Sequence, residues 1–238
     1  MDDLALSKTL LFRGATAQEV QSMLACLGAE RRQYAKGQPI YRAGEVITSL
    51  GLVLSGNVLV EFGDFWGNTA VLDSVGPGQI FAETYACTPG EPLMVNVVAA
   101  CQTQVLFLNL EHVLRVCSHA CSHHNTLIRN LLALSAQKNL NLTRKIFHTS
   151  ARSIRARLLS YLSYQALRSG SRSFSIPFNR QQLADYLNVD RSALSNALSK
   201  MQREGILRTE RNRFELLQDP QSCDARRAGI SPPPNAYP

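Results

Sequence analysis

The chain has 238 residues, of which 45% are apolar and 18% charged, with a formal charge of +7 and a pI near 9.3. This length and mixed composition exclude a disulfide-stapled mini-protein and a disordered chain, and they predict one large core or two smaller ones. The excess charge lies in one part, because residues 1–148 carry 11 basic and 11 acidic side chains whereas residues 149–238 carry 14 and 7. The basic part indicates a polyanionic partner, and the neutral part indicates a separate task such as sensing or assembly.

The start of the chain and its hydropathy predict a cytoplasmic protein that does not associate with a membrane. Residues 1–4 are acidic, lack a basic leader and precede no sustained apolar stretch, so a secretory signal is not expected. No apolar run reaches the roughly 18 residues that a membrane-spanning helix needs. In a reducing compartment the six cysteines are expected to be thiols.

Residues 4–28 predict short helices, and residues 31–110 predict many short strands. Thr16 with Glu19 three positions later is a helix-start signal, and an apolar stripe follows it. This stripe consists of Val20, Met23, Leu24 and Leu27. From residue 31 the apolar period changes to two and glycines recur, which is typical of a sandwich or barrel built from hairpins.

A long helix is predicted from about residue 123 to residue 147, where neither proline nor glycine interrupts the chain. It has two apolar faces. One contains Leu127, Leu131, Leu134, Lys138 and Asn141, and the other contains Ile128, Leu132, Leu142 and Ile146. The first face has the alternating spacing of a parallel coiled coil, so we expect it to pack on a second copy of the chain while the other packs on the chain's own strands. The alternative is that the first stripe is intramolecular core.

Residues 176–207 have helix-turn-helix spacing. Asn179 and Asp190 are predicted caps of two short helices separated by a tight turn. If Leu194, Leu198 and Met201 of the second helix face inward, its short polar and basic side chains face outward, which suits a helix in the DNA major groove. These outward residues are Arg191, Ser192, Ser195, Asn196, Ser199 and Lys200. The alternative is an ordinary helical hairpin with a solvated face.

Residues 206–210 and 214–217 predict a two-stranded wing with a basic turn at Arg211, Asn212 and Arg213. Residues 219–238, with Pro220 and three consecutive prolines from Pro232, predict a disordered tail.

The order of these parts resembles the CRP/FNR family of bacterial transcription regulators over roughly residues 8–218, and the motifs at residues 179–184 and 190–195 carry the resemblance. It implies an α+β fold with an N-terminal β-roll that resembles a cyclic-nucleotide-binding jelly roll, a long dimerisation helix and a C-terminal winged helix-turn-helix. The implied domains are residues 1–122, 123–148 and 149–218, followed by the tail. By position, Arg191 resembles the family arginine that reads guanine. By the same resemblance, Ser192 and Asn196 lie where other members place base-reading residues, and Arg180 and Gln181 lie where they bind phosphate. Ser195 and Lys200, on the outward face of the same helix, are further expected DNA contacts.

The sensor half differs from the family's nucleotide-binding members. Residues 76–83 resemble their phosphate-binding cassette, with Glu83 where a ribose-binding glutamate stands. Leu93 and Met94 replace the arginine-serine pair that holds the cyclic phosphate, and Ala82 replaces a glycine. A buried phosphate without a cation is under-compensated, so cyclic AMP is not expected as the effector.

A cluster of cysteines and histidines at residues 117–124 is the other concentration of reactive side chains. Cys117, Cys121 and His124 are spaced i, i+4 and i+7, and such a set suits a soft metal, a haem iron or an oxidation switch. The alternative is that these cysteines are small packing residues.

We therefore expect an effector-modulated, sequence-specific DNA-binding transcription regulator, not an enzyme, that acts as a homodimer on a palindromic operator, with RNA polymerase as a partner if it activates transcription. One alternative is a metal- or haem-dependent redox or gas sensor of the same fold. Another is a β-roll metalloenzyme fused to a DNA-binding domain, against which stands the lack of any histidine in residues 31–110.

Overall fold

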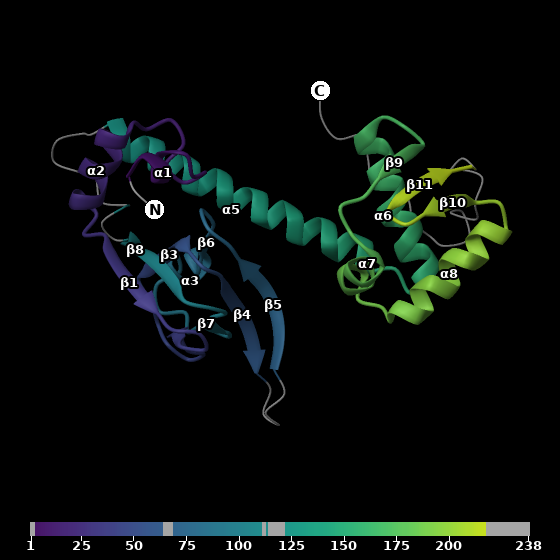
Figure 1. The fold of residues 1–238 in the computed structure, drawn as a ribbon, viewed down its shortest axis with the longest axis horizontal. Coiled ribbons are helices and arrows are strands. Elements are labelled where there is room, and N and C mark those ends of the chain that lie inside the picture. The colour runs from purple at the N-terminus through teal and green to yellow at the C-terminus, as the bar shows by residue number, and fades with distance from the viewer. Residues whose placement is uncertain (1–2, 64–68, 111–112, 114–121, 218–238) are drawn as a thin grey trace. The chain divides into compact units, whose positions relative to one another are not determined.

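The computed structural model describes residues 3–63, 69–110, 113 and 122–217, and the chain divides into two compact units, residues 1–138 and 139–238 (Figure 1). Helix α5 (Ser122–Thr149) contributes its residues up to Lys138 to the first unit and the rest to the second. The other elements of the first unit are α1 (Asp3–Ser7), α2 (Ala17–Cys26), β1 (Glu30–Tyr34), β2 (Pro39–Tyr41), β3 (Ser49–Ser55), β4 (Val58–Gly63), β5 (Thr69–Val75), β6 (Ile80–Phe81), α3 (Glu83–Ala86), β7 (Asn96–Ala99) and β8 (Thr103–Asn109).

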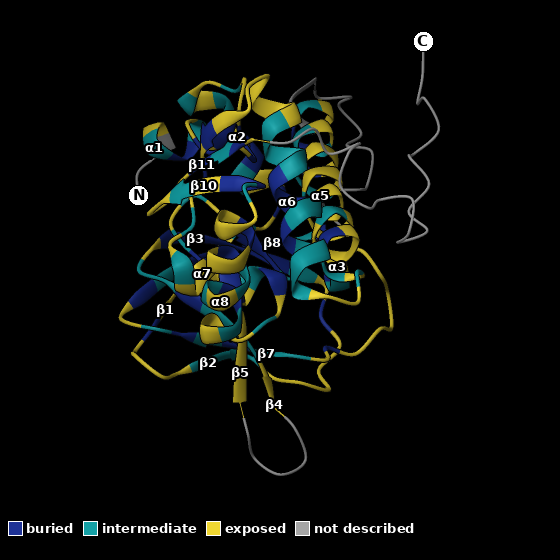
Figure 2. Cartoon of the chain, turned by 90° about the vertical axis from the view of Figure 1, so that its right-hand side faces the viewer, coloured by how far each residue is buried: buried dark blue, intermediate teal, exposed yellow. Residues whose placement is uncertain are grey.

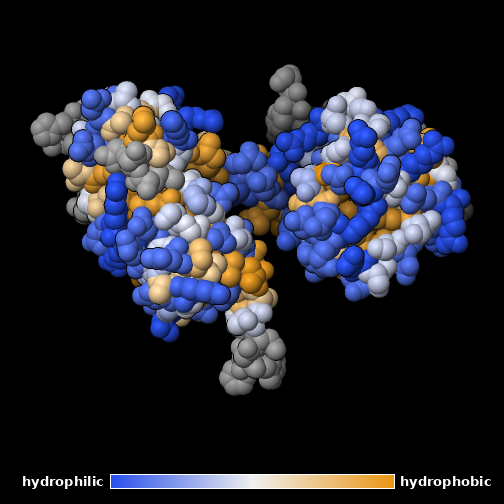
Figure 3. Space-filling view, viewed as in Figure 1, coloured by the Kyte–Doolittle hydropathy of each residue, from blue (hydrophilic) through white to orange (hydrophobic). Residues whose placement is uncertain are grey.

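The first unit is an antiparallel β-roll made of two four-stranded sheets, which confirms the predicted fold class. The strand orders are β1-β8-β3-β6 and β2-β7-β4-β5. Residues of both sheets pack together between them, among them Val53, Val58, Val97, Val105 and Phe107. Strand β5 is an edge strand of its sheet and exposes Val71 and Leu72. Figure 3 shows hydrophobic surface over β4 and β5.

The central strands β3 and β8 of the first sheet are buried on both faces, whereas its edge strand β1 is mostly exposed. Alternate residues of β3 and β8 belong to two different cores, because Leu52 and Leu106 pack with α1, α2 and α5 whereas Val53 and Val105 pack against the second sheet. Figure 2 accordingly shows β3 and β8 largely buried and β5 exposed. This double burial explains why these two strands have nearly continuous apolar sequences.

Helix α2 begins and packs as predicted. The Thr16 hydroxyl accepts a bond from the Glu19 amide at 3.3 Å, and the Glu19 carboxylate accepts one from the Thr16 amide at 2.7 Å. Three residues of the predicted stripe, Val20, Met23 and Leu27, are buried in the core.

The assignment of the two faces of α5 was wrong. Leu127 and Leu131 have exposed fractions of 2% and 5% and belong to the core of their own chain, with Leu134 packed against them. The other face is open from Leu132 onward, because Leu132, Leu142 and Ile146 are 68%, 61% and 67% exposed. Ile128, the first residue of that face, packs against the core. Both faces are apolar, so sequence spacing could not tell which one the roll covers.

The second unit contains a helical core with a small sheet. Its elements are α6 (Ile154–Ser169), β9 (Ser173–Ser175), α7 (Arg180–Leu187), α8 (Arg191–Arg203), β10 (Leu207–Glu210) and β11 (Arg213–Leu216). The three strands form an antiparallel sheet in the order β10-β11-β9, so the predicted wing has an additional strand. No helix among the described residues is long and apolar enough to cross a membrane.

Candidate nucleic-acid interface

Helices α7 and α8 are joined by a tight turn at Asn188. The Asn179 side chain accepts a bond from the Gln182 amide, and the Gln182 side chain accepts one from the Asn179 amide, both at 2.9 Å. Asn188 ends α7 in the left-handed conformation with φ 53°, which asparagine tolerates better than most residues. The predicted helix-turn-helix is therefore present.

Asp190 caps α8, the second helix of this motif. Its Oδ1 accepts bonds from the Ser192 amide at 2.8 Å, the Ala193 amide at 3.0 Å and the Ser192 hydroxyl at 2.5 Å. The bond from the Ser192 hydroxyl, followed by those from the two amides, lowers the pKa of the Asp190 carboxyl below its ordinary value. The cap is thus ionised at neutral pH and fixes the start of α8.

The apolar face of α8 points inward, as predicted. Leu194, Leu198 and Met201 have at most 2% of their surface exposed. The predicted DNA-facing residues Arg191, Ser192, Asn196 and Lys200 are exposed, and Ser195 is half-buried with its hydroxyl donating to the Arg191 carbonyl at 2.9 Å.

Arg180 connects α7 to the wing. Its Nη2 donates to the Thr209 hydroxyl at 2.8 Å, and its guanidinium lies 5.3 Å from the centre of the Phe214 ring. Burial lowers the pKa of Arg180 below its ordinary value. The residue that the family resemblance assigns to phosphate therefore also fixes the wing to the helix pair.

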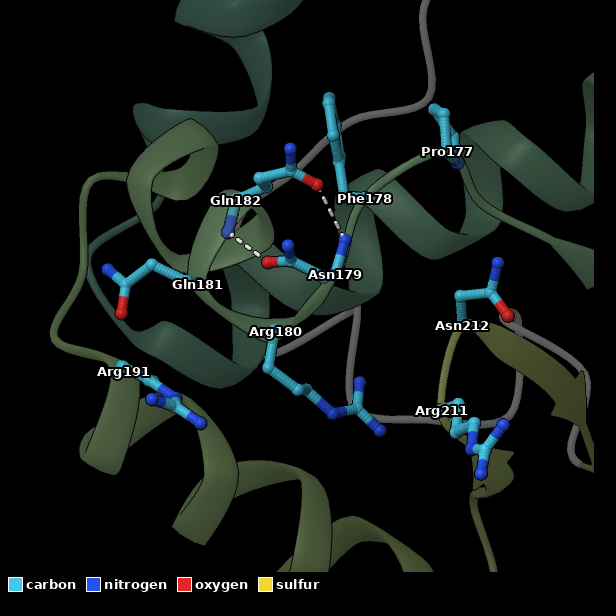
Figure 4. A pocket seen from close by; sticks show the side chains of 9 residues that line it. All are labelled: Pro177, Phe178, Asn179, Arg180, Gln181, Gln182, Arg191, Arg211 and Asn212. Carbon is cyan, nitrogen blue, oxygen red and sulfur yellow. Dashed lines mark hydrogen bonds between the residues drawn. The ribbon is translucent and has the colours of Figure 1, made fainter.

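A surface hollow of about 700 Å³ lies between the start of α7, the start of α8 and the wing turn. Figure 4 shows Arg180 between Arg191 and Arg211 at its rim. The remaining lining residues are Pro177, Phe178, Asn179, Gln181, Gln182 and Asn212. Three guanidinium groups and no carboxylate make this hollow suited to an anion.

Arg157 is a structural residue of this site that sequence reasoning missed. Its Nη1 donates to the carbonyls of Leu187 and Asn188 at 3.1 and 2.9 Å, and its Nε donates to the Ala151 carbonyl at 2.8 Å. One guanidinium thus joins the turn before α8 to the segment between α5 and α6. Its sequence surroundings carry no signal of this role, because Leu187 and Asn188 lie about 30 residues away.

The three predicted effector residues have different surroundings. Glu83 is 4% exposed at the start of α3, and its Oε1 lies 2.7 Å from Lys138 Nζ. Leu93 is buried in the apolar core, whereas Met94 is 66% exposed. Ala82, which precedes Glu83, is left-handed with φ 62°, a conformation that glycine adopts more readily.

The predicted metal-ligand set is not covered by the structure. Cys117 and Cys121 lie outside the described residues, as does the side chain of His124, whose backbone belongs to α5. Among the side chains that the structure describes, no group of three histidine, cysteine or carboxylate residues could hold a metal ion. Cys87 and Cys101 are free thiols.

Comparison with known proteins assigns both units. Residues 31–120 match the cyclic nucleotide-binding domain, and residues 156–221 match the Crp-like helix-turn-helix domain. A protein of Thermus thermophilus named cyclic AMP receptor protein is 28% identical over 198 residues, which are 83% of this chain and 88% of the relative.

Solved structures also resemble this chain over most of its length. The catabolite activator protein of Thermus thermophilus is 27% identical with a TM-score of 0.50, and the match covers 87% of this chain and 93% of that one. The protein CprK complexed with OCPA is 17% identical to this chain, with a TM-score of 0.53. The match covers 84% of this chain and 92% of CprK, and at this identity it supports the fold alone.

Proposed function

Because this chain belongs to the CRP/FNR family of transcription regulators, we propose that it binds a palindromic operator as a homodimer, with α8 of each protomer in the major groove. The observation that carries the proposal is the exposed polar face of α8 beside the hollow that Arg180, Arg191 and Arg211 line. Within this proposal the β-roll is the sensing unit, and the chain has no catalytic task.

Each side chain of the interface has a proposed role. Arg191, at the first turn of α8, makes a bidentate contact to guanine, and Ser192, Ser195, Asn196 and Lys200 contact further base edges or phosphates. Arg180 and Gln181 bind phosphate at the start of α7, where backbone amides favour an anion. The Gln181 side chain donates to Asp185 at 2.8 Å, so its amide group is already oriented. Arg211 of the wing turn is added to this set because it lines the same hollow.

The dimer seam is proposed on the open face of α5. Leu132, Ser135, Asn139, Leu142 and Ile146 alternate at spacings of three and four. That is the spacing of the a and d positions of a coiled coil, whose polar members set the register. Leu132, Leu142 and Ile146 are each more than 60% exposed in the single chain, and pairing with a second copy would remove this apolar surface from water.

Cyclic AMP is not the proposed effector, although the Thermus thermophilus relative is named for it. Leu93 and Met94 offer no positive charge to a cyclic phosphate, and the Glu83 carboxylate is already paired with Lys138. A metal, haem or oxidation response at Cys117, Cys121 and His124 stays a second proposal, which rests on the sequence alone.

The test is selection of binding sites from random duplex DNA with the full chain, followed by affinity measurements on the selected operator. Arg191→Ala is expected to cost about 1 to 3 kcal/mol and to relax the base preference at one position of each half-site. Arg203→Ala, which removes the same charge from the exposed end of α8, is the matched control. If the two variants bind with equal affinity and equal preference, α8 is not the recognition helix.

A further inference from the structure

Lys138 fixes helix α5 to the β-roll at the segment that precedes α3. Its ammonium lies 2.7 Å from Glu83 Oε1 and donates to the Ile80 carbonyl at 2.9 Å. Ile80 begins β6 and Glu83 begins α3, so one side chain of α5 binds both ends of this bend. These contacts lie within the first unit.

The ion pair between Lys138 and Glu83 compensates a buried charge. Glu83 is the one carboxylate among the described residues that are classed as buried, and a buried carboxylate is costly unless a partner compensates its charge. Lys138 is 42% exposed at its side chain, so it loses less hydration than Glu83 does. Removing the Lys138 ammonium would leave the charge of the buried Glu83 carboxylate uncompensated. Because the Lys138 side chain is partly exposed, another side chain of similar length fits at this position.

The same lysine contacts the carboxylate that, by resemblance, would bind the ribose of a nucleotide. The Glu83 carboxylate and the Ile80 carbonyl both accept bonds from the Lys138 ammonium, and bonds of this charge-assisted kind are stronger than those from a neutral hydroxyl. A ligand hydroxyl that bonded to Glu83 would therefore have to share the carboxylate with an attached cation.

We propose that Lys138 is an internal ligand of the roll, which fixes α5 in its DNA-binding arrangement without a bound nucleotide. The proposal rests on the function proposed above, because α5 also carries the seam residue Leu132, six positions before Lys138 on the same helix. Release of Lys138 frees this stretch of α5 from β6 and α3, and operator affinity falls as a result.

The experiment compares Lys138→Met, Glu83→Gln and their double variant with Lys145→Met in the full chain. Lys145 is an exposed residue of α5, and its substitution removes the same charge without touching Glu83. Operator affinity is measured by fluorescence anisotropy with and without cyclic AMP and cyclic GMP. Hydrogen exchange of residues 80–87 and 130–140 is measured in the absence of DNA.

The wild type is expected to bind its operator without nucleotide and with the same affinity when nucleotide is added. Lys138→Met and Glu83→Gln should each lower the affinity at least tenfold, and the double variant should be no weaker than the weaker single variant, because both remove one interaction. Exchange in both segments should rise in these variants and stay unchanged in Lys145→Met.

Equal exchange and equal affinity of Lys138→Met and Lys145→Met would overturn the proposal, as would a nucleotide that strengthens operator binding of the wild type. Should Glu83→Gln fail to fold, Lys138→Met decides the question, because its position is partly exposed. Failure of the proposed function is distinguishable, since the wild type would then select no DNA sequence while the exchange comparison still reports on Lys138.

Discussion

His148 is a buried histidine among aromatic rings near the end of α5. It is 1% exposed, and its Nδ1 lies 2.9 Å from the Ser160 hydroxyl. The rings of Tyr161, Tyr164 and Tyr186 have centres 5.6, 5.4 and 6.3 Å away. No residue that the structure describes forms a hydrogen bond with Nε2. Burial lowers the pKa of His148 below its ordinary value of 6.5.

This shift makes the second unit sensitive to acid. The unfolded chain binds a proton at His148 near pH 6.5 and the folded chain only at lower pH, so the stabilisation is complete above about pH 6.5 and is lost as the pH falls through the lower folded pKa. We expect His148→Phe to reduce the loss of stability between pH 7.5 and 5.5. Urea unfolding followed by circular dichroism measures the free energy of unfolding at each pH.

Tyr164→Phe is the control for the His148 prediction, because it alters the same group of rings without removing the imidazole. It should keep the wild-type dependence on pH. A His148→Phe variant with an unchanged pH dependence would show that another group titrates.

Gly51 is the place where β3 approaches the Phe81 ring most closely. A Cβ at this position would lie 2.1 Å from Phe81 Cζ, and Phe81 is 2% exposed, so the ring has little room to move. We expect Gly51→Ala to destabilise the first unit by about 1 to 3 kcal/mol through overpacking. Thermal unfolding measures the change. Gly63→Ala, where a Cβ would meet no atom of the described residues within 4 Å, should leave the midpoint nearly unchanged.

Among the elements, α5 combines two tasks on two faces. Leu127 and Leu131 complete the core of the roll, and the open face with Leu132, Leu142 and Ile146 is proposed as the dimer seam. The face of α5 on which a residue lies therefore decides whether a charged substitution there disrupts the core of the roll or the proposed dimer seam.

We expect Leu132→Glu to give folded monomers that no longer bind a palindromic operator, because two carboxylates would face each other in the seam. Leu131→Glu should instead unfold the roll, since it buries a charge in the core. Light scattering and circular dichroism separate these outcomes. Ala133→Glu, on an exposed position outside the seam, should keep the wild-type mass. A wild type that is monomeric at micromolar concentration would contradict the seam.

At the scale of the whole molecule, the two units differ in net charge and in proposed task. The excess of basic residues lies from residue 149 onward, with the exposed face of α8 and the hollow, whereas the neutral roll carries Glu83 and its internal cation. This separation lets the DNA affinity depend steeply on salt while the roll stays insensitive to it.

The neutral roll should not bind cyclic nucleotides. Calorimetry of the wild type with cyclic AMP or cyclic GMP is expected to show no saturable heat, because Leu93 and Met94 supply no cation for the phosphate. The Thermus thermophilus relative, named cyclic AMP receptor protein, is the positive control. Micromolar binding by this chain would mean that the alignment of residues 76–83 with the phosphate cassette is wrong.

The sequence by itself determined what depends on neighbours along the chain. Thr16, Asn179 and Asp190 cap helices through bonds to residues two or three positions away, so a short window contains the whole interaction. The inward positions of α8 follow in the same way from its helical period, because Leu194 and Leu198 lie one turn apart on one face.

Tertiary structure alone decided which partners distant residues have. Glu83 is paired with a lysine 55 positions later, and the two faces of α5 were distinguished only by which of them the roll covers. Arg157 and Arg180 likewise bind atoms about 30 residues away, in the turn before α8 and in the wing. Spacing fixes the direction of a side chain relative to its own helix, but a contact across the fold depends on the packing of whole elements, which no local pattern contains.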